Sequence, residues 1–364
     1  MVVARDQIGQ ALPRVLSRAL LGSRAWPRLM RRLRGRGWQY ARTCIGLALG
    51  GGLLWLGLRN LSWRDFSRVL ARVRWPWLIL SWMTIPVGTC VKALRWRFLL
   101  RDANSHARWP RLIAFLTVGQ LVDAVVFSNL GELTRAYLVS KASDRTLPLA
   151  LGTIVAEKVL EGTALLSVTL VLALNLVLPD WLGTASLIFA ALFALLLAGL
   201  ILVTLGRERL LRWCSRLPGK LYTLAATGLE GLSALRRPRT LFAAAASTLL
   251  VWLLGLVTNY CLFMALGLPP SVLGALLLLV VHYLAVLIPG VPAQVGLFHY
   301  VTILALGTLE VGRELSMPYA IVLHALIYGT MIALGATSAC WLSLRLRTLT
   351  RTVRARSSEA QQTE

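Results

Sequence analysis

The stretch SNLGELTRAYLVSKASDRTLPLALGTIVAEKVLEG, residues 128–162, places charged residues inside or beside segments that are apolar enough to lie in a membrane. These charged residues are Glu132, Arg135, Glu157, Lys158 and Glu161. An ionisable side chain near the centre of a bilayer costs roughly 3 kcal/mol, so each of them is expected to have a function. We therefore interpret the rest of the chain as a scaffold that holds this stretch near the middle of a membrane.

The composition of the chain is typical of a helical membrane protein. Its 364 residues are 57% hydrophobic and 15% charged, and several apolar runs reach the ~18 residues that a membrane-spanning helix needs. The formal net charge is +24, and the basic residues fall mainly between the apolar runs, as expected of loops that face anionic lipids. The predicted fold is an all-α polytopic membrane protein. Its predicted partners are membrane lipids with anionic headgroups, and no nucleic acid.

Several kinds of chemistry lack their usual signatures in this sequence. The five cysteines are far apart, and no Cys/His cluster has the spacing of a metal site, so we expect no disulfide framework, no metal and no cofactor. The chain also contains no Walker A motif, no HExxH, no GxSxG and no GxGxxG after a strand. These absences favour a transporter without a nucleotide site over a soluble type of enzyme.

The apolar segments differ in length, and this difference predicts two kinds of membrane element. Six segments are interpreted as full spans: about 43–58, 76–93, 147–178, 182–204, 241–266 and 317–342. Two others, 112–141 and 271–307, consist of two short apolar halves around a break. The break residues are Asn129 and Gly131 in the first, and Pro289, Gly290, Pro292 and Gly296 in the second. Since each half is shorter than the ~20 residues of a span, we predict re-entrant hairpins, which give eight membrane elements in all.

Basic residues predict the orientation and the flanking regions. With both hairpins re-entrant, 31 of the 39 Lys and Arg residues lie on the side that holds both termini, which places the termini in the cytoplasm. We therefore predict a basic cytoplasmic arm (1–42), a single transmembrane domain (43–342) and a basic, disordered cytoplasmic tail (343–364). Segment 59–75 is basic too, and its arginines recur every four residues, which indicates an amphipathic helix at the membrane surface.

The two hairpin regions belong to a predicted internal repeat. Segment 111–139 resembles 275–304, with Gly131 matching Gly296, and 147–162 resembles 316–329. We therefore predict one repeat over about 76–178 and a second over about 241–342. In the proposed topology the two repeats enter from opposite sides of the membrane. Proteins with such an inverted repeat place their substrate site at the midplane, between the repeats.

The charged residues of the first repeat form the candidate site. Glu132 and Arg135 are three residues apart, so they can pair on one helix face. We expect Arg135 to bind a lipid phosphate in a polar cavity while Glu157, Glu161 and the adjacent Lys158 orient it. The helix that begins near the break would add partial positive charge. The alternative interpretation is a structural salt-bridge network that pins the hairpin.

Other ionisable residues are candidates for the same cavity. Asp123 either faces the cavity or pairs with a basic residue such as Lys158. His282, His299 and His324 lie in the second repeat, where they could relay protons, bind headgroups or simply be satisfied within a polar interior. Since they come from three segments without local ligand spacing, we do not predict a metal site.

The order of these motifs resembles that of a known family. GELTRAYLV followed by EKVLEG is similar to the pattern of the lysylphosphatidylglycerol synthase transmembrane, or flippase-like, family, which is GE-x-x-R, then an acidic–basic pair, then an acid. Glu132, Arg135, Glu157, Lys158 and Glu161 match these positions, with Lys158 in place of the more usual Arg and Glu161 in place of the more usual Asp. PGVPAQVGLFHY resembles the family's late Pro-Gly…Gly-x-Phe-Glu stretch, although His299 stands where an acid is common.

The resemblance covers roughly 43–342 and implies a multi-pass protein of the cytoplasmic membrane. Some relatives are the lipid-translocating half of aminoacyl-phosphatidylglycerol synthases. Because this chain ends after the membrane region, lipid aminoacylation is not expected. We predict a translocase for a phospholipid or lipid-linked molecule. The alternative is a membrane-embedded enzyme, or an accessory subunit, of envelope glycolipid or terpenoid-lipid synthesis.

Overall fold

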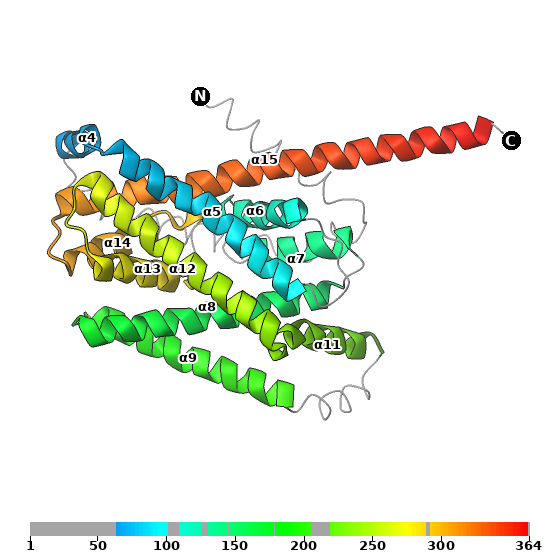
Figure 1. The fold of residues 1–364 in the computed structure, drawn as a ribbon, viewed down its shortest axis with the longest axis horizontal. Helices are drawn as coiled ribbons and strands as arrows, with labels where there is room; N and C mark the ends of the chain where they lie inside the picture. The colour runs from blue at the N-terminus through cyan, green and yellow to red at the C-terminus, as the bar shows by residue number, and fades with distance from the viewer. Residues whose placement is uncertain are drawn as a thin grey trace, which may run out of the picture.

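A computed structural model describes residues 63–100, 109–125, 130–143, 146–177, 179–205, 219–288 and 292–362 (Figure 1). Within these ranges every regular element is a helix, which confirms the predicted fold class. The α-helices are α4 (Trp63–Ala71), α5 (Trp75–Leu100), α6 (Trp109–Val125), α7 (Leu130–Ala142), α8 (Leu147–Asn175), α9 (Asp180–Leu205), α11 (Gly219–Leu232), α12 (Pro238–Leu266), α13 (Val272–Val286), α14 (Leu297–Gly307) and α15 (Arg313–Gln362). Two short 3₁₀ helices are η1 (Ser233–Arg236) and η2 (Pro292–Gln294).

Five long helices correspond to predicted spans. Helices α5, α9, α12 and α15 are long and apolar enough to cross a membrane. Helix α8 has 29 residues, which at about 1.5 Å per residue is also sufficient, but it carries the charged EKVLE segment near its middle. The first predicted span, 43–58, and the predicted arm, 1–42, lie outside the described residues.

The two predicted hairpins are present as pairs of short helices. Helices α6 and α7 pack against each other, as do α13 and α14. They contain 17, 13, 15 and 11 residues, so each is shorter than the ~20 residues of a full span. Asn129, Pro289 and Gly290 lie outside the described residues. In the described part of the second break, Gly296 has a φ of 91° and precedes the first turn of α14, a conformation that suits a glycine.

Helices α5–α8 and α12–α15 have matching arrangements, in agreement with the predicted repeat. Each unit is a long helix, a hairpin and a second long helix. The contacts also correspond, because α6 packs on α15 as α13 packs on α8, and α7 packs on α8 as α14 packs on α15. The hairpins approach from opposite ends of the molecule (Figure 1). The repeat is therefore visible in the packing as well as in the sequence.

The two units meet along α5 and α12, which run antiparallel side by side (Figure 1). Near one end, the Arg74 N–H donates to the Ala265 carbonyl at 2.9 Å. Towards the other end, the Arg95 Nη1 donates to the Thr248 Oγ1 at 3.2 Å. Between them, the Ser81 hydroxyl donates to the Thr258 carbonyl at 2.9 Å. Such interhelical hydrogen bonds help to hold helices together where the surroundings are apolar.

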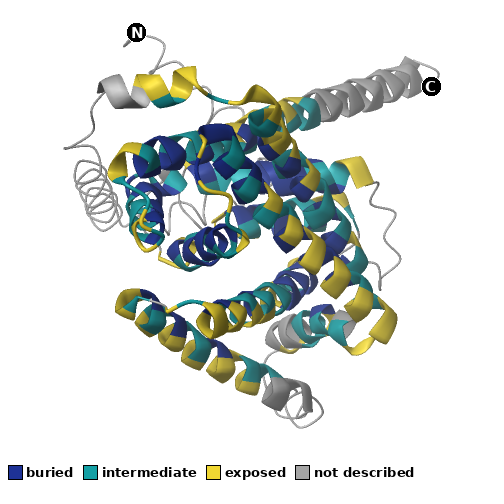
Figure 2. Cartoon of the chain, turned by 60° about the vertical axis from the view of Figure 1, so that its left-hand side comes forward, coloured by how far each residue is buried: buried dark blue, intermediate teal, exposed yellow. Residues whose placement is uncertain are grey.

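Buried residues concentrate at the centre of the bundle and exposed residues along its outer helices (Figure 2). The largest buried cluster joins residues of α8, α12, α13, α14 and α15. Large apolar side chains are exposed on the outer helices; Leu187 of α9, for example, is 73% exposed. An apolar exterior of this kind fits a lipid environment, since apolar patches this extensive are rare on water-soluble monomers.

Two predictions about flanking regions need correction. The second span does not end near residue 93, because α5 continues to Leu100 through KALRWRFLL, which contains no glycine or proline. Lys92 and Arg95, counted as loop residues in the charge analysis, therefore lie within this helix. The tail 343–364, predicted to be disordered, continues α15 to Gln362. It also lacks glycine and proline, and adding residues to an existing helix avoids the cost of nucleation.

Candidate functional site

A cavity of about 530 Å³ is lined by residues from both repeats and from α9. Six of the predicted site residues line it: Asp123, Glu132, Arg135, Glu157, Lys158 and Glu161. His299 and His324 are not among the lining residues, whereas His282 is. The structure therefore brings the charged residues of the first repeat to one cavity and leaves two of the predicted histidines behind its wall.

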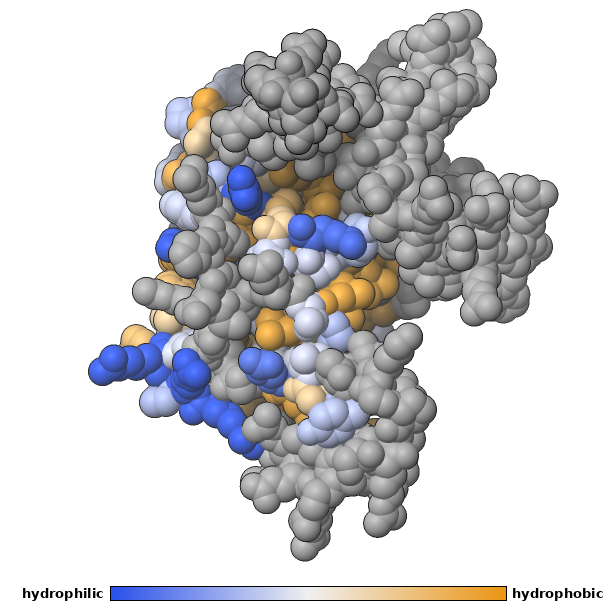
Figure 3. All heavy atoms as spheres, turned by 90° about the vertical axis from the view of Figure 1, so that its right-hand side faces the viewer, coloured by the Kyte–Doolittle hydropathy of each residue, from blue (hydrophilic) through white to orange (hydrophobic). Residues whose placement is uncertain are grey.

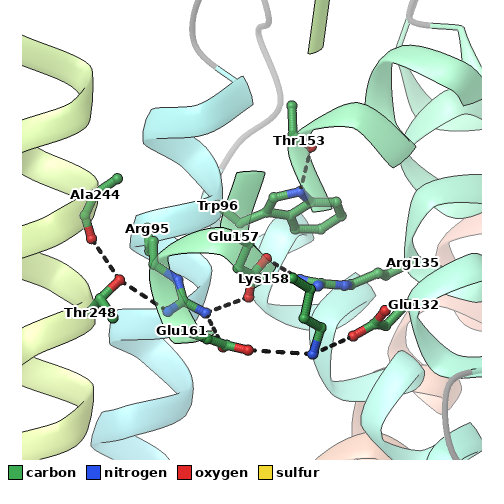
Figure 4. Close-up of polar contacts among 10 residues, drawn as sticks. All are labelled: Arg95, Trp96, Glu132, Arg135, Thr153, Glu157, Lys158, Glu161, Ala244 and Thr248. Atoms are coloured by element: carbon green, nitrogen blue, oxygen red, sulfur yellow. Dashed lines mark hydrogen bonds and ion pairs between the residues drawn. The ribbon is translucent and has the colours of Figure 1, made fainter. Parts of the chain in front are cut away.

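The charged residues form one continuous chain of ion pairs (Figure 4). Arg135 lies 2.9 Å from Glu157, and Glu157 lies 2.5 Å from Arg95. Arg95 also lies 2.5 Å from Glu161. Lys158 continues the chain, 3.3 Å from Glu161 and 2.7 Å from Glu132. Cations and carboxylates alternate along it, so each glutamate has at least one cationic partner, which is how buried charges become tolerable.

Arg95 is the central residue of this chain of ion pairs, and the sequence interpretation missed it. Its side chain is 0% exposed, and it bonds both glutamates of α8 as well as Thr248 of α12. The sequence did contain a signal, because Arg95, Trp96 and Leu99 have helical spacing and so indicate that α5 continues through them. We instead counted Arg95, a basic residue at the end of a span, as part of a loop.

Arg135 is held between its ion-pair partner and an aromatic ring. Its guanidinium carbon lies 5.0 Å from the centre of the Trp96 ring, a distance at which a cation is attracted to an aromatic face. Trp96 is itself oriented, because its Nε1–H donates to the Thr153 Oγ1 at 3.2 Å. These contacts fix the position of Arg135 at the cavity wall.

The predicted pairing of Glu132 with Arg135 is wrong. Although they are three residues apart on α7, Glu132 pairs with Lys158 and Arg135 pairs with Glu157. Helix α7 packs directly against α8, so two interhelical pairs form in place of one pair within the helix. The ion pairs therefore connect the hairpin to the neighbouring helix.

Asp123 has a role that the sequence interpretation did not predict. Its Oδ1 accepts a hydrogen bond from the Gly131 N–H at 2.8 Å, so it binds the first turn of α7 across the hairpin. No ion pair joins it to Lys158 in the described part of the chain. A carboxylate at a helix N-terminus is stabilised by the helix dipole. The partial positive charge at the N-terminus of α7, which we expected to face a ligand, is therefore already engaged by Asp123.

The histidines of the second repeat form an aromatic cluster. His282 stacks on Phe298 with ring centres 4.1 Å apart, and its Nε2 lies 2.8 Å from the Thr302 Oγ1. The His324 Nε2 lies 2.9 Å from the Ala293 carbonyl oxygen, and its ring centre is 4.8 Å from that of His299. Among the described residues, no group of three or more His, Cys, Asp or Glu side chains is placed to hold a metal ion.

Another part of the cavity wall is apolar. Phe189, Phe193 and Leu196 line it from α9, and Leu279 and Val286 line it from α13. The rings of Phe189 and Phe193 stack with centres 5.6 Å apart. The cavity therefore combines a charged wall, built by the first repeat, with an apolar wall that includes the outermost described helix.

These features define a multi-pass helical membrane protein with two opposed hairpins and charged residues in an amphipathic cavity. Residues 43–335 match the family described as the lysylphosphatidylglycerol synthase TM region, and the chain belongs to this family. Membership places it among membrane proteins related to lipid modification or flipping. No curated protein and no solved structure matches the chain.

Proposed function

We propose that this protein translocates a phospholipid or a lipid-linked molecule across the cytoplasmic membrane, with the polar headgroup passing through the cavity. The observation that carries this proposal is the amphipathic lining, in which the ion-paired residues of α7 and α8 border the same space as apolar residues of α9 and α13. A lipid has the same division into a polar and an apolar part. The volume, about 530 Å³, lies within the range of roughly 300–1,000 Å³ for small-molecule sites.

Arg135 is the residue we assign to the anionic headgroup. Within the described residues its guanidinium donates one hydrogen bond, from Nη1 to Glu157. A guanidinium has five N–H donors, which suit the geometry of a phosphate. Arg95 differs, since it lies entirely within the protein and bonds three side chains. We therefore assign ligand binding to Arg135 and a structural role to Arg95.

The state of the carboxylates supports translocation over catalysis. A membrane-embedded enzyme would use Glu157 or Glu161 as a base. Each of these side chains is bound by two cations, Glu157 by Arg95 and Arg135, and Glu161 by Arg95 and Lys158. Carboxylates engaged in this way serve to hold positive charges in place. We accordingly propose a facilitator or an ion-coupled transporter that needs no nucleotide.

Exposed basic residues support the proposed orientation, with both termini in the cytoplasm. Five of them, Arg97, Lys141, Arg236, Arg237 and Arg239, belong to the end of the molecule where α5 and α7 finish and α12 begins. Four others, Arg68, Arg72, Arg74 and Arg313, belong to α4, the segment that follows it and the start of α15. Figure 3 looks onto the end that holds the first five and shows strongly hydrophilic residues beside apolar ones. Basic surfaces of this kind favour the cytoplasmic side of a membrane.

The proposal is tested with purified protein in vesicles that contain a fluorescent lipid. A membrane-impermeant quencher reports the rate at which the lipid reaches the outer leaflet. We expect the wild type to accelerate translocation of an anionic or polyprenyl lipid over protein-free vesicles, and Arg135→Gln to lose most of this acceleration. The matched control is Arg97→Gln, which removes an exposed arginine that does not line the cavity. The proposal is wrong if no such lipid moves faster with the wild type than without protein.

A further inference from the structure

Asp123 differs from the other carboxylates that line the cavity. Within the described residues, each of the three glutamates in the wall forms an ion pair with a basic side chain, whereas Asp123 forms none. Its Oδ1 accepts a hydrogen bond from the Gly131 N–H at 2.8 Å. Protonating one of the glutamates would leave a cation without its counter-charge, which is costly inside a protein. Protonating Asp123 at its other oxygen, Oδ2, breaks no ion pair, so Asp123 is the carboxylate of this wall that can gain and lose a proton most easily.

The electrostatic surroundings of Asp123 come from both repeats. Its helix, α6, packs against α5, α7, α15 and η2. The titratable side chains that act on Asp123 from neighbouring elements include Glu132 and Arg135 of α7, Lys158 of α8 and Tyr328 of α15. Lys92 of α5 lines the same cavity, and η2 has no titratable side chain. Asp123 therefore responds directly to the charge at Arg135, the residue assigned to the headgroup.

The formal charges in and behind the cavity wall balance when Asp123 is ionised. Among the described residues, the four cations are Lys92, Arg95, Arg135 and Lys158, and the four carboxylates are Asp123, Glu132, Glu157 and Glu161. An anionic headgroup adds a negative charge to this balanced group. Uncompensated charge is costly at membrane depth, and a nearby negative charge favours the neutral form of a carboxyl group. A proton on Asp123 restores the balance.

His282 is the competing proton acceptor, since it also lines the cavity. The groups that act on it electrostatically are His299 and His324, which belong to the aromatic cluster of the second repeat. Arg135 is not among them, whereas it does act on Asp123. The charge of a headgroup at Arg135 is therefore felt by Asp123, and the geometry favours the carboxylate over the imidazole.

Asp123 also connects proton binding to the position of Arg135. Its Oδ1 holds the first turn of α7, and a Cβ on Gly131 would clash with its carboxylate, so the contact at the hairpin tip is close. Hydrogen bonds to an ionised acceptor are roughly twice as strong as neutral ones, and a helix N-terminus favours a negative charge. Protonation at Oδ2 therefore weakens the bond at Oδ1 and loosens α7, which carries Arg135 about one turn further on.

We infer that the protein is a proton-coupled symporter in which one proton binds to Asp123 for each anionic headgroup that binds to Arg135. This inference rests on the proposed translocase function and specifies its driving ion. A proton passes from water on the open side of the cavity to the Asp123 Oδ2, and it returns to water on the other side together with the headgroup. Each ligand favours binding of the other, as linkage requires. Because the loaded site is neutral, translocation should respond to a pH difference and not to the membrane potential.

The steady-state distribution of a lipid between the two leaflets tests the coupling. The probes are fluorescent phosphatidylglycerol and a fluorescent polyprenyl phosphate sugar, because the phosphodiester of each keeps its negative charge across the pH range used. Vesicles receive a pH difference while potassium and valinomycin hold the membrane potential at zero. An uncoupled translocase only equalises the leaflets, whereas one-to-one symport enriches the lipid by up to about tenfold per pH unit in the leaflet that faces the alkaline side. A potassium diffusion potential without a pH difference should produce no enrichment, and protein-free vesicles give the baseline.

Isothermal titration calorimetry counts the protons. Binding of a short-chain form of the transported probe to the protein in detergent is measured at one pH in two buffers with different ionisation enthalpies. The difference between the heats gives the number of protons taken up. We expect uptake approaching one proton per lipid in the wild type and none in Asp123→Asn, whose side chain resembles the protonated acid and keeps an oxygen for the Gly131 N–H. In vesicles Asp123→Asn should equalise the leaflets without enrichment.

The matched control is another carboxylate close to a helix N-terminus. Asp180 lies in the first turn of α9, is exposed and does not line the cavity. Asp180→Asn should therefore keep the proton uptake and the enrichment of the wild type. Each variant is first compared with the wild type by size-exclusion chromatography and thermal unfolding in detergent. The measurements on the wild type alone already decide whether coupling exists, whatever the folding of the variants.

The outcomes distinguish this inference from the function on which it rests. If the wild type accelerates no anionic lipid, the translocase function fails and the coupling falls with it. If lipid moves faster but only to equal leaflets, or if binding takes up no proton, translocation stands and the coupling is overturned. Proton uptake or enrichment that persists in Asp123→Asn would place the proton elsewhere and overturn the assignment. Enrichment driven by the membrane potential alone would show that net charge crosses, which also contradicts a neutral symport.

Discussion

A single terminal nitrogen of Arg95, Nη2, donates to both Glu157 and Glu161, at 2.5 Å each. The two glutamates lie one turn apart on α8, so one guanidinium joins α5 to α8 at two successive positions. Removing one partner of a fully buried ion pair leaves the other charge uncompensated, which makes Arg95 central to the stability of the bundle.

Arg95→Gln should destabilise the protein strongly. The substitution leaves Glu157 with Arg135 and Glu161 with Lys158, but both lose the fully buried guanidinium that they share. We expect a loss of roughly 3–5 kcal/mol in the free energy of unfolding, measured as a lower melting temperature in detergent. Arg97→Gln, on the exposed face of the same helix, is the control and should change stability by less than about 0.5 kcal/mol. Equal melting temperatures for Arg95→Gln and the wild type would show that the ion-pair chain is not structural.

Lys158→Met should cost far less than the change at Arg95. The Lys158 side chain is 48% exposed, and its partner Glu132 is 26% exposed. Ion pairs with this much access to solvent contribute at most about 1 kcal/mol. The same thermal measurement should therefore rank Arg95→Gln well below Lys158→Met in stability. The reverse order would mean that burial does not govern the strength of these ion pairs.

Gly119→Ala should disturb the first hairpin. A Cβ at Gly119 would lie 2.7 Å from the Gly131 carbonyl oxygen on the facing helix, so α6 and α7 would have to separate. Overpacking of this kind costs about 1–3 kcal/mol. Gly183→Ala in α9 is the matched control, because a Cβ there meets nothing within 4 Å and alanine favours a helix. If both variants melt like the wild type, the hairpin does not require the close approach of its helices.

A disulfide across α6 and α15 should stop translocation. The Thr117 hydroxyl of α6 donates to the Ser338 Oγ of α15 at 2.8 Å. The contact between α13 and α8 corresponds to this one in the other unit. At that second contact, His282 and Val286 of α13 border the cavity. A translocase that alternates between its repeats has to open the first contact and close the second. Thr117→Cys with Ser338→Cys, in a background without native cysteines, should be inactive when oxidised and active when reduced. Full activity of the oxidised protein would show that these helices do not separate.

Accessibility labelling should report the two ends of the molecule from opposite sides. Lys141 and Glu310 are both exposed and lie at the ends of the two hairpins. In intact cells of a cysteine-free variant, an impermeant thiol reagent should label Glu310→Cys and should reach Lys141→Cys after the membrane is opened. Labelling of both from the same side would contradict the inverted arrangement, and the opposite pattern would reverse the orientation.

Much of the architecture could be predicted from local features of the sequence. The spans and hairpins follow from the lengths of apolar runs and from glycine and proline at the breaks, because a backbone in lipid has to satisfy its own hydrogen bonds. The charged residues at 132–161 were also identifiable, since a buried charge is costly wherever it lies. The alternation of positive and negative charges in the ion pairs could not be identified from the sequence. The same holds for the unpaired amide oxygens of Gln120 and Gln294.

Two errors show where local reasoning fails. Glu132 and Arg135 have the spacing of a pair within a helix, yet each bonds a residue of α8, because the packing of the two helices brings nearer and more buried partners. Arg95 looked like part of a basic loop, but it pairs with Glu157, 62 positions later in the chain. Neither sequence segment contains information about the other.

The sequence by itself determined that the chain is a helical membrane protein with two opposed hairpins and a charged segment, since hydropathy and backbone breaks act over a few residues. Only the tertiary structure decided which charges meet, that Asp123 binds the N-terminus of α7, and which polar groups stay open in the cavity. Those outcomes depend on the helix faces that come together when α5 packs against α12 and α7 against α8. Electrostatic and hydrogen-bond energies act over a few ångströms in space, whatever the separation along the chain.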